Sequence, residues 1–199
     1  MKTVTSEKIL LPAVRGSFLK LAKPVYFRDT PAPNEKPKYQ ASFLLDPQNA
    51  QHAAAIKMIK SEASRIAKLS FPDGVPKSME KCFGTSDELD KVYDGYDGMF
   101  WFRSSSIDRV PIVGPRKNAE GKFTPVQEGD EFWPYSGCYL NAKVAMWVQT
   151  THGRKGINGN LIALQFVKHG DAFGRPSADP DSEFEELSID DTADDDIAF

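Results

Sequence analysis

The chain has 199 residues, of which 40% are hydrophobic and 27% charged, and its formal net charge is −3 at pH 7. This length suffices for one domain with a hydrophobic core, and no apolar run approaches the roughly 18 residues of a membrane helix. The first residues lack the apolar core of a signal peptide, so we expect a cytoplasmic protein without membrane contact. Cys82 and Cys138 have no partner motif nearby, which indicates reduced structural thiols.

Two strands are predicted near the start of the chain. Residues 14–27 are rich in β-branched and aromatic types, and Gly16 allows a bulge there. Residues 38–45 alternate polar and apolar side chains and are followed by Asp46 and Pro47, which predict the end of a strand. The proline-rich segment between the two strands is expected to be a loop.

One long helix is predicted next, over residues 48–68, where apolar residues recur at helical spacing. Asp46 is the expected N-cap, and Pro47 suits the first turn. The outward Lys and Arg side chains of this helix are expected to be solvated rather than to form a site. Residues 71–98 are predicted to be rich in loops, with a short helical turn at 85–89.

The segment from Met99 to Ser106 is the densest aromatic run of the chain. Because side chains alternate along a strand, Phe100 and Phe102 should share one face, and Trp101 and Arg103 the other. We expect the first face to pack in the core and the second to offer a stacking surface with a cation beside it.

Two basic hairpin tips are predicted in the second half of the chain. The first, residues 115–122, joins two short strands, and the second, residues 152–156, joins strands predicted at 138–149 and 160–168. Alternating strands, one long helix and extended basic hairpin loops indicate a mainly β fold, a small closed or partly open β-barrel.

Residues 179–199 form an acidic segment with ten carboxylates and no Lys or Arg. Like charges repel and little apolar area is available, so we expect a disordered interaction tail behind a folded domain of residues 1–178. The chain ends in Asp194, Asp195, Asp196, Ile197, Ala198 and Phe199. Phe199 carries a ring and the α-carboxylate, which together suit a small pocket with an apolar floor and a basic rim. The alternative is a tail that serves only solubility.

Opposite charges are segregated between the two parts of the chain. All 25 basic residues lie in residues 1–178, which keep 18 of the 28 acidic residues, for a formal charge of +7. A basic body is suited to polyphosphate, and an acidic tail either meets a protein or folds back over the body. We therefore expect the tail to compete for the binding groove when no nucleic acid is present.

Several segments together resemble a bacteriophage family of OB-fold single-stranded DNA-binding proteins, and the acidic ending is similar to the tails of bacterial and phage proteins of this class. The segments are Tyr135–Lys143, Lys155–Asn158, Leu164–Asp171, Lys38–Phe43 and Phe102–Ser106. The resemblance implies an OB-type barrel with an inserted helix, no catalytic centre, and a role in phage DNA replication, recombination and repair in the infected bacterial cell. It also implies that the tail recruits replication or recombination proteins; homodimerisation is left open.

Binding of unpaired DNA without sequence preference needs cations for phosphates and aromatic faces for bases. Both types are interleaved on the predicted strands and hairpins. The residues that we expect to contact single-stranded DNA are Lys38, Tyr39, Trp101, Arg103, Arg116, Lys117, Lys122, Tyr139, Lys143, Arg154 and Lys155. Any one of the aromatic residues, a tryptophan above all, is more often a packed core residue than a base platform, and tyrosine is the better candidate.

Two other classes of function stay open at this point. An acidic loop with Asp87, Glu88, Asp90, Asp94 and Asp97 could hold two divalent ions, as in a metal-dependent nuclease or resolvase. A protein-only adaptor would use the tail for one partner and the basic body for another. The three histidines are widely separated and no Cys or His pair has metal-ligand spacing, so we expect no cofactor, no structural metal and no catalytic residues.

Overall fold

The computed structural model describes residues 3–27, 29, 31, 35–91, 93–150 and 155–174. Its barrel strands are β1 (Ile9–Val25), β2 (Lys38–Leu45), β5 (Phe100–Ser106), β8 (Tyr139–Gln149) and β9 (Gly156–Lys168). The other elements are α1 (Ala50–Ser70), β3 (Glu80–Lys81), β4 (Phe83–Thr85), a 3₁₀ turn η1 (Ser86–Glu88), β6 (Ile112–Lys117) and β7 (Phe123–Pro125).

The five barrel strands pair in the closed order β1–β2–β5–β9–β8–β1. The pairing of β5 with β9 is parallel and closes the barrel, whereas the other four pairings are antiparallel. A side chain at Gly159 would collide with the Arg103 carbonyl, so glycine allows β9 to approach β5 closely here. The predicted mainly β barrel with one inserted helix is confirmed.

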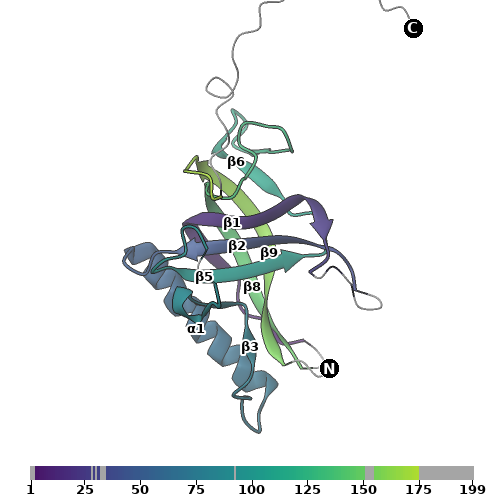
Figure 1. The fold of residues 1–199 in the computed structure, drawn as a ribbon. Coiled ribbons are helices and arrows are strands. Elements are labelled where there is room, and N and C mark those ends of the chain that lie inside the picture. Colours follow the sequence, from purple (N-terminus) through teal and green to yellow (C-terminus); the bar gives the residue numbers. More distant parts are fainter. Residues whose placement is uncertain are drawn as a thin grey trace, which may run out of the picture.

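Helix α1 covers one end of the barrel, and the β6–β7 hairpin extends from the other (Figure 1). Apart from His52 in the first turn, the buried residues of α1 are apolar and recur at helical spacing: Ala55, Ile56, Ile59, Ala63, Ile66 and Ala67. The helix begins at Ala50, and its N-cap is Asn49, whose Oδ1 accepts hydrogen bonds from the amides of Gln51 (2.9 Å) and His52 (3.2 Å). The prediction of Asp46 as N-cap was wrong, because its carboxylate instead accepts from the Gln48 amide in the preceding turn, at 2.8 Å.

Strand β1 begins at Ile9, five residues earlier than predicted. Its bulge was expected at Gly16 but lies a little further along the strand. The register between β1 and β2 shifts between Ser17 and Lys20, and Phe18 has a φ of 49°. Gly16 has a packing role instead, since a Cβ there would lie 3.0 Å from the Leu19 side chain. The bulge at Phe18 turns its ring outward, where it is 49% exposed.

The side chains of β5 divide between two hydrophobic clusters. Phe100 and Phe102 belong to the main core inside the barrel, together with Phe43 and Leu45 of β2. Trp101 lies in a second, small cluster with Leu44 and Tyr96, outside the barrel wall. The predicted division of β5 into two faces is therefore confirmed.

Candidate nucleic-acid interface

The candidate site is the outer face of β1, β2 and β5, and strand register defines it. Ser42 of β2 lies between Ser17 of β1 and Arg103 of β5, and these paired residues share one face of the sheet. Arg15 and Trp101 flank Leu44 in the same way. Polar side chains and two arginines thus cross three neighbouring strands on the outside of the barrel, a surface that we call the outer face.

Trp101 forms the base of this face rather than an open ring. The residue is 6% exposed, and its Nε1 donates to the Thr85 carbonyl at 2.9 Å. The Arg103 guanidinium lies 4.5 Å from the ring centroid, a cation–π contact that leaves Arg103 itself exposed. In this conformation the Trp101 ring offers no free surface to a base, whereas Arg103 is open to a phosphate.

Aromatic rings that are more accessible lie beside Trp101. The exposed Phe18 ring meets the half-buried Tyr93 ring edge-on, with centroids 5.0 Å apart and an interplanar angle of 85°. Tyr96 is buried below them; burial raises the pKa of its hydroxyl, and hydrogen bonds with Ser17 and Ser42 act in the opposite direction. Tyr96 therefore supports the face, and Phe18 and Tyr93 are its accessible rings. Neither is among the expected contacts, although Tyr93 is one of the tyrosines that the sequence favours over tryptophan as a base platform.

Arg15 connects the outer face to the end of β9. Its Nη2 donates to the Asp171 carbonyl at 2.6 Å, and its Nε donates to the Gly137 carbonyl at 3.2 Å. The guanidinium lies 4.2 Å from the Phe173 ring centroid and 5.5 Å from that of Tyr139. The chain that follows β9 thus reaches the outer face at Phe173, and the following Gly174 amide donates to Asp94 at 3.3 Å.

The predicted strand residues are divided between the inside and the outside of the barrel. Lys38 shares its side of β2 with Ser42 on the outer face, but Tyr39 points the other way and packs against the main core. Tyr139 and Lys143 lie on the outward side of β8, where Lys168 Nζ is 4.5 Å from the Tyr139 ring centroid. Lys38, Arg103, Tyr139 and Lys143 therefore all lie on the outward sides of their strands, β2, β5 and β8.

The predicted hairpin residues lie at two opposite ends of β9. Arg116, Lys117 and Lys122 are exposed on the β6–β7 hairpin, and β6 runs parallel to β9 with Val113 opposite Gln165. Lys155 precedes the first residue of β9, and its Nζ lies 5.7 Å from the Phe71 ring centroid. A strand of 13 residues spans about 40 Å, so the two basic hairpin ends do not form one cluster.

Some predicted residues lie outside the part of the chain that the structure describes: Arg154 and the tail residues Asp194, Asp195, Asp196, Ile197 and Phe199. The residues of this face that sequence reasoning missed are Arg15 and Phe18, and Tyr93 was favoured only as one of several tyrosines. Phe18 could be found only through its bulge, and Arg15 only through contacts with residues 122 and 156 positions away.

Two further observations concern the other classes of function. Within the described residues, no three His, Cys, Asp or Glu side chains gather as they would around a metal ion. No helix in the described ranges is both long and apolar enough to cross a membrane.

Comparison with known proteins gives concordant matches. Residues 7–197 match the family described as Enterobacter phage Enc34, ssDNA-binding protein. A putative protein p50 from Acyrthosiphon pisum secondary endosymbiont phage 1 is 30% identical over 92% of this chain and 95% of its own length. The single-stranded DNA-binding protein of bacteriophage Enc34, solved in complex with ssDNA, superposes with a TM-score of 0.67 at 22% identity, over 84% of this chain and 89% of that one. Another structure of the Enc34 protein has a TM-score of 0.64 at 22% identity and covers 92% of this chain and 99% of that one.

The Enc34 structures share the fold of this chain, and the family match extends over nearly its whole length. The family is one of DNA-binding proteins, which agrees with the expectation of a binding protein rather than an enzyme. The chain belongs to the family of Enc34-type phage single-stranded DNA-binding proteins.

Proposed function

We propose that this protein binds single-stranded DNA without sequence preference along the outer face. It would coat and protect exposed strands during phage DNA replication and recombination. The observation that carries the proposal is the exposed Arg103 on this face, with the Phe18 and Tyr93 rings beside it and Arg15 on β1. Ser17 and Ser42 lie between them but are buried and hydrogen-bond to Tyr96. Cations and aromatic faces at this spacing supply what a single strand needs.

The hairpin residues extend this site along the backbone. Arg116, Lys117 and Lys122 are exposed and have no part in the hydrophobic core, so they can follow phosphates beyond the barrel. Lys122 pairs with Glu120 at 3.8 Å, but both side chains are exposed, so this ion pair is weak and leaves the lysine accessible. We infer that the hairpin contributes salt-dependent affinity rather than base contacts.

The proposal is tested by removing Arg103, which is exposed and has no core role. Arg103→Ala should weaken binding of fluorescein-labelled oligothymidylate by about 5- to 10-fold at about 50 mM salt, measured by anisotropy, because one charge-assisted contact is worth roughly 1–1.5 kcal/mol. Lys57→Ala removes one exposed charge from α1 and serves as the matched control. Equal affinity in the two variants, with both folded by thermal melting, would refute the proposed face.

We further propose that the acidic tail recruits replication or recombination proteins through Ile197 and Phe199. The support is chemical: an apolar residue and a terminal ring follow three aspartates, and the ring carries the chain's own carboxylate. Phe199→Ala should leave oligothymidylate affinity unchanged and abolish pull-down of host replication proteins. Recruitment that persists in this variant would contradict the proposal.

A further inference from the structure

The outward side of β8 and β9 forms a second surface, which carries no acidic residue. Side chains alternate along β8, and those that point away from the main core are Tyr139, Asn141, Lys143, Ala145, Trp147 and Gln149. The register places polar residues of β9 beside this row, with Asn160 opposite Ala145 and Asn158 opposite Trp147. The two strands contain Lys143 and Lys168 and not one Asp or Glu. We call this surface the β8–β9 face.

Trp147 differs from the other two tryptophans in its surroundings. Trp101 is 6% exposed and Trp133 packs against the main core, whereas Trp147 is half-buried and belongs to neither hydrophobic cluster. Its neighbours across the strands are Asn158 on β9 and Thr5 in the segment before β1. The Trp147 ring therefore lies on a polar sheet surface, where it is available to stack on a base.

Cations accompany this ring along β8. The Tyr139 ring lies between two of them, with Lys168 Nζ 4.5 Å and the Arg15 guanidinium 5.5 Å from its centroid. Lys143 is on the same side of β8, midway between Tyr139 and Trp147, which are about 26 Å apart along the strand at about 3.3 Å per residue. Neither lysine pairs with a carboxylate in the part of the chain that the structure describes. The two lysines can therefore bind phosphates.

The β8–β9 face adjoins both the outer face and the β6–β7 hairpin. β6 pairs with β9 and β7 with β6, so the hairpin extends the sheet on the β9 side of this face (Figure 1). On the other side, Arg15 of β1 lies opposite Tyr139 of β8, where the outer face ends. The Phe173 ring packs on Arg15 at this boundary, so a strand that crosses from one face to the other passes beside Phe173. Beyond β9 it meets the hairpin cations Arg116, Lys117 and Lys122.

We propose that the β8–β9 face is a second contact surface for single-stranded DNA, an inference that rests on the proposed function and extends it. Trp147 stacks on a base, Lys143 and Lys168 bind phosphates, and Tyr139 holds Lys168 in place. The DNA on this face is either the continuation of the strand on the outer face or a second strand. The experiment below distinguishes these two sources.

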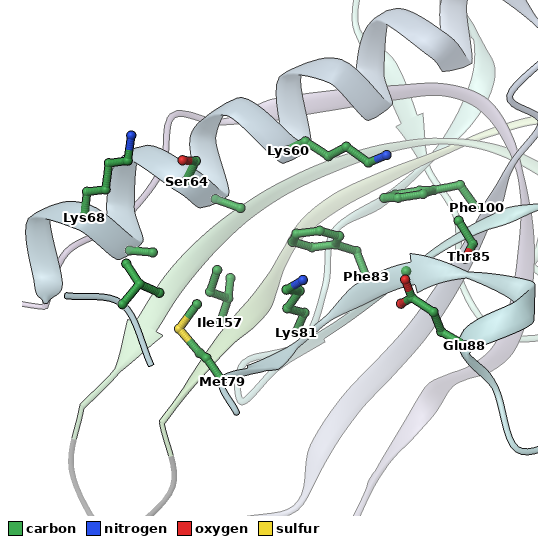
Figure 2. Close-up of a pocket in the computed structure, with 14 residues that line it drawn as sticks. Lys60, Ser64, Lys68, Met79, Lys81, Phe83, Thr85, Glu88, Phe100 and Ile157 are labelled. Atoms are coloured by element: carbon green, nitrogen blue, oxygen red, sulfur yellow. The ribbon is translucent and has the colours of Figure 1, made fainter. Parts of the chain in front are cut away.

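A lysine-rimmed pocket elsewhere in the molecule provides a matched control. It has a volume of about 500 Å³ and lies between α1 and β4, with Lys60 and Lys68 of α1 and Lys81 of β3 at its edge (Figure 2). The rings at its floor, Phe83 and Phe100, are 7% and 2% exposed, so they offer no free ring face to a base. The pocket thus has cations like those of the β8–β9 face but no stacking surface.

Binding of short and long oligothymidylate to the full-length protein tests the proposal. A strand of about 8 nucleotides suffices for one face and one of about 24 nucleotides for two, since an OB fold occupies roughly 4–16 nucleotides. Trp147→Leu and Lys143→Gln should each weaken binding of the long strand at least about fivefold, because one removes a stacked base and the other a phosphate contact.

Three matched variants control for packing and for charge. Trp147→Phe keeps a ring and Lys143→Arg keeps a cation, so both should bind the long strand within about twofold of wild type. Lys60→Gln removes an exposed charge at the pocket and should also stay within about twofold. Thermal melting checks that every variant is folded.

Stoichiometry in isothermal titration calorimetry identifies the source of the strand. If one strand continues from the outer face, each protein binds one short oligonucleotide, and Trp147→Leu impairs only the long one. If a second strand binds, wild type binds two short oligonucleotides and Trp147→Leu binds one. Either result supports the proposal. Wild-type affinity and stoichiometry in Trp147→Leu, with Arg103→Ala impaired, would overturn it and leave the outer face intact. Equal impairment of Trp147→Phe and Trp147→Leu would assign the ring a packing role and would also overturn it.

Discussion

At the scale of single residues, Phe18 combines a strained backbone with an open ring. Its φ of 49° lies in the left-handed region, which β-carbon sterics disfavour for phenylalanine. The ring is half exposed and contacts Tyr93. A conformation that costs stability and exposes an apolar ring is consistent with a role in binding.

The role of Phe18 can be separated from its backbone effect. Asparagine tolerates left-handed backbone, so Phe18→Asn should keep or raise the melting temperature. Because the variant lacks the ring on which one base would stack, it should lose about 1–3 kcal/mol of binding free energy, which corresponds to about 5- to 150-fold weaker oligothymidylate binding. Anisotropy titration and thermal melting check the two effects. Wild-type affinity in Phe18→Asn would remove this ring from the binding face.

Glu62 gives a residue-scale prediction for pH. Its carboxylate accepts hydrogen bonds from Arg65 (2.8 Å) and from the Glu7 amide (2.9 Å), and the Arg65 side chain above all lowers the pKa of Glu62. The resulting stabilisation is present above pH about 4.5 and disappears as the pH falls through the lowered pKa. Glu62→Gln should therefore be less stable than wild type at about pH 7, and the difference should shrink as the pH falls below about 4.5, in urea unfolding. A constant difference across this range would contradict the ion pair's contribution.

At the scale of elements, β5 and β2 show how far the sequence predicted which side chains face the core and which face outward. The alternation in β5 correctly predicted the core face of Phe100 and Phe102 and the outward face of Arg103. The same rule put Lys38 and Tyr39 on opposite sides of β2, so they could not both lie on one DNA-binding face. Alternation does not say which side of a strand is outside, and it did not predict that Leu89, Tyr93, Tyr96 and Met99 would pack around Trp101.

The β6–β7 hairpin carries a prediction at this scale. Replacing Arg116, Lys117 and Lys122 by alanine should reduce the salt dependence of binding, by about 0.7 in the slope of log affinity against log salt for each phosphate that the variant no longer binds. The fold should persist, since all three side chains are exposed. Lys57→Ala, on α1, is the comparison and should keep the wild-type slope. A slope that stays at the wild-type value in the hairpin variant would show that this element does not touch the strand.

At the scale of the whole molecule, features set by composition could be predicted from the sequence, whereas features set by contacts between distant residues could not. The basic body and acidic tail were evident from composition, since residues 1–178 carry a formal +7. The contacts of Arg15 with Asp171 and Phe173 were not evident from composition, because they join β1 to the residues that follow β9. The lysine-rimmed pocket likewise gathers residues from α1, β3, β4, β5 and β9. Such sites arise from tertiary packing and leave no pattern along the chain.

The central claim is that a single strand lies on the outer face of β1, β2 and β5. Photo-cross-linking of the full-length protein to oligothymidylate containing 5-iodouracil, followed by peptide mass spectrometry, tests it most directly. We predict cross-links at Phe18 or Tyr93, on peptides from β1 and the loop before β5. Cross-links confined to α1, with none on these peptides, would contradict the claim.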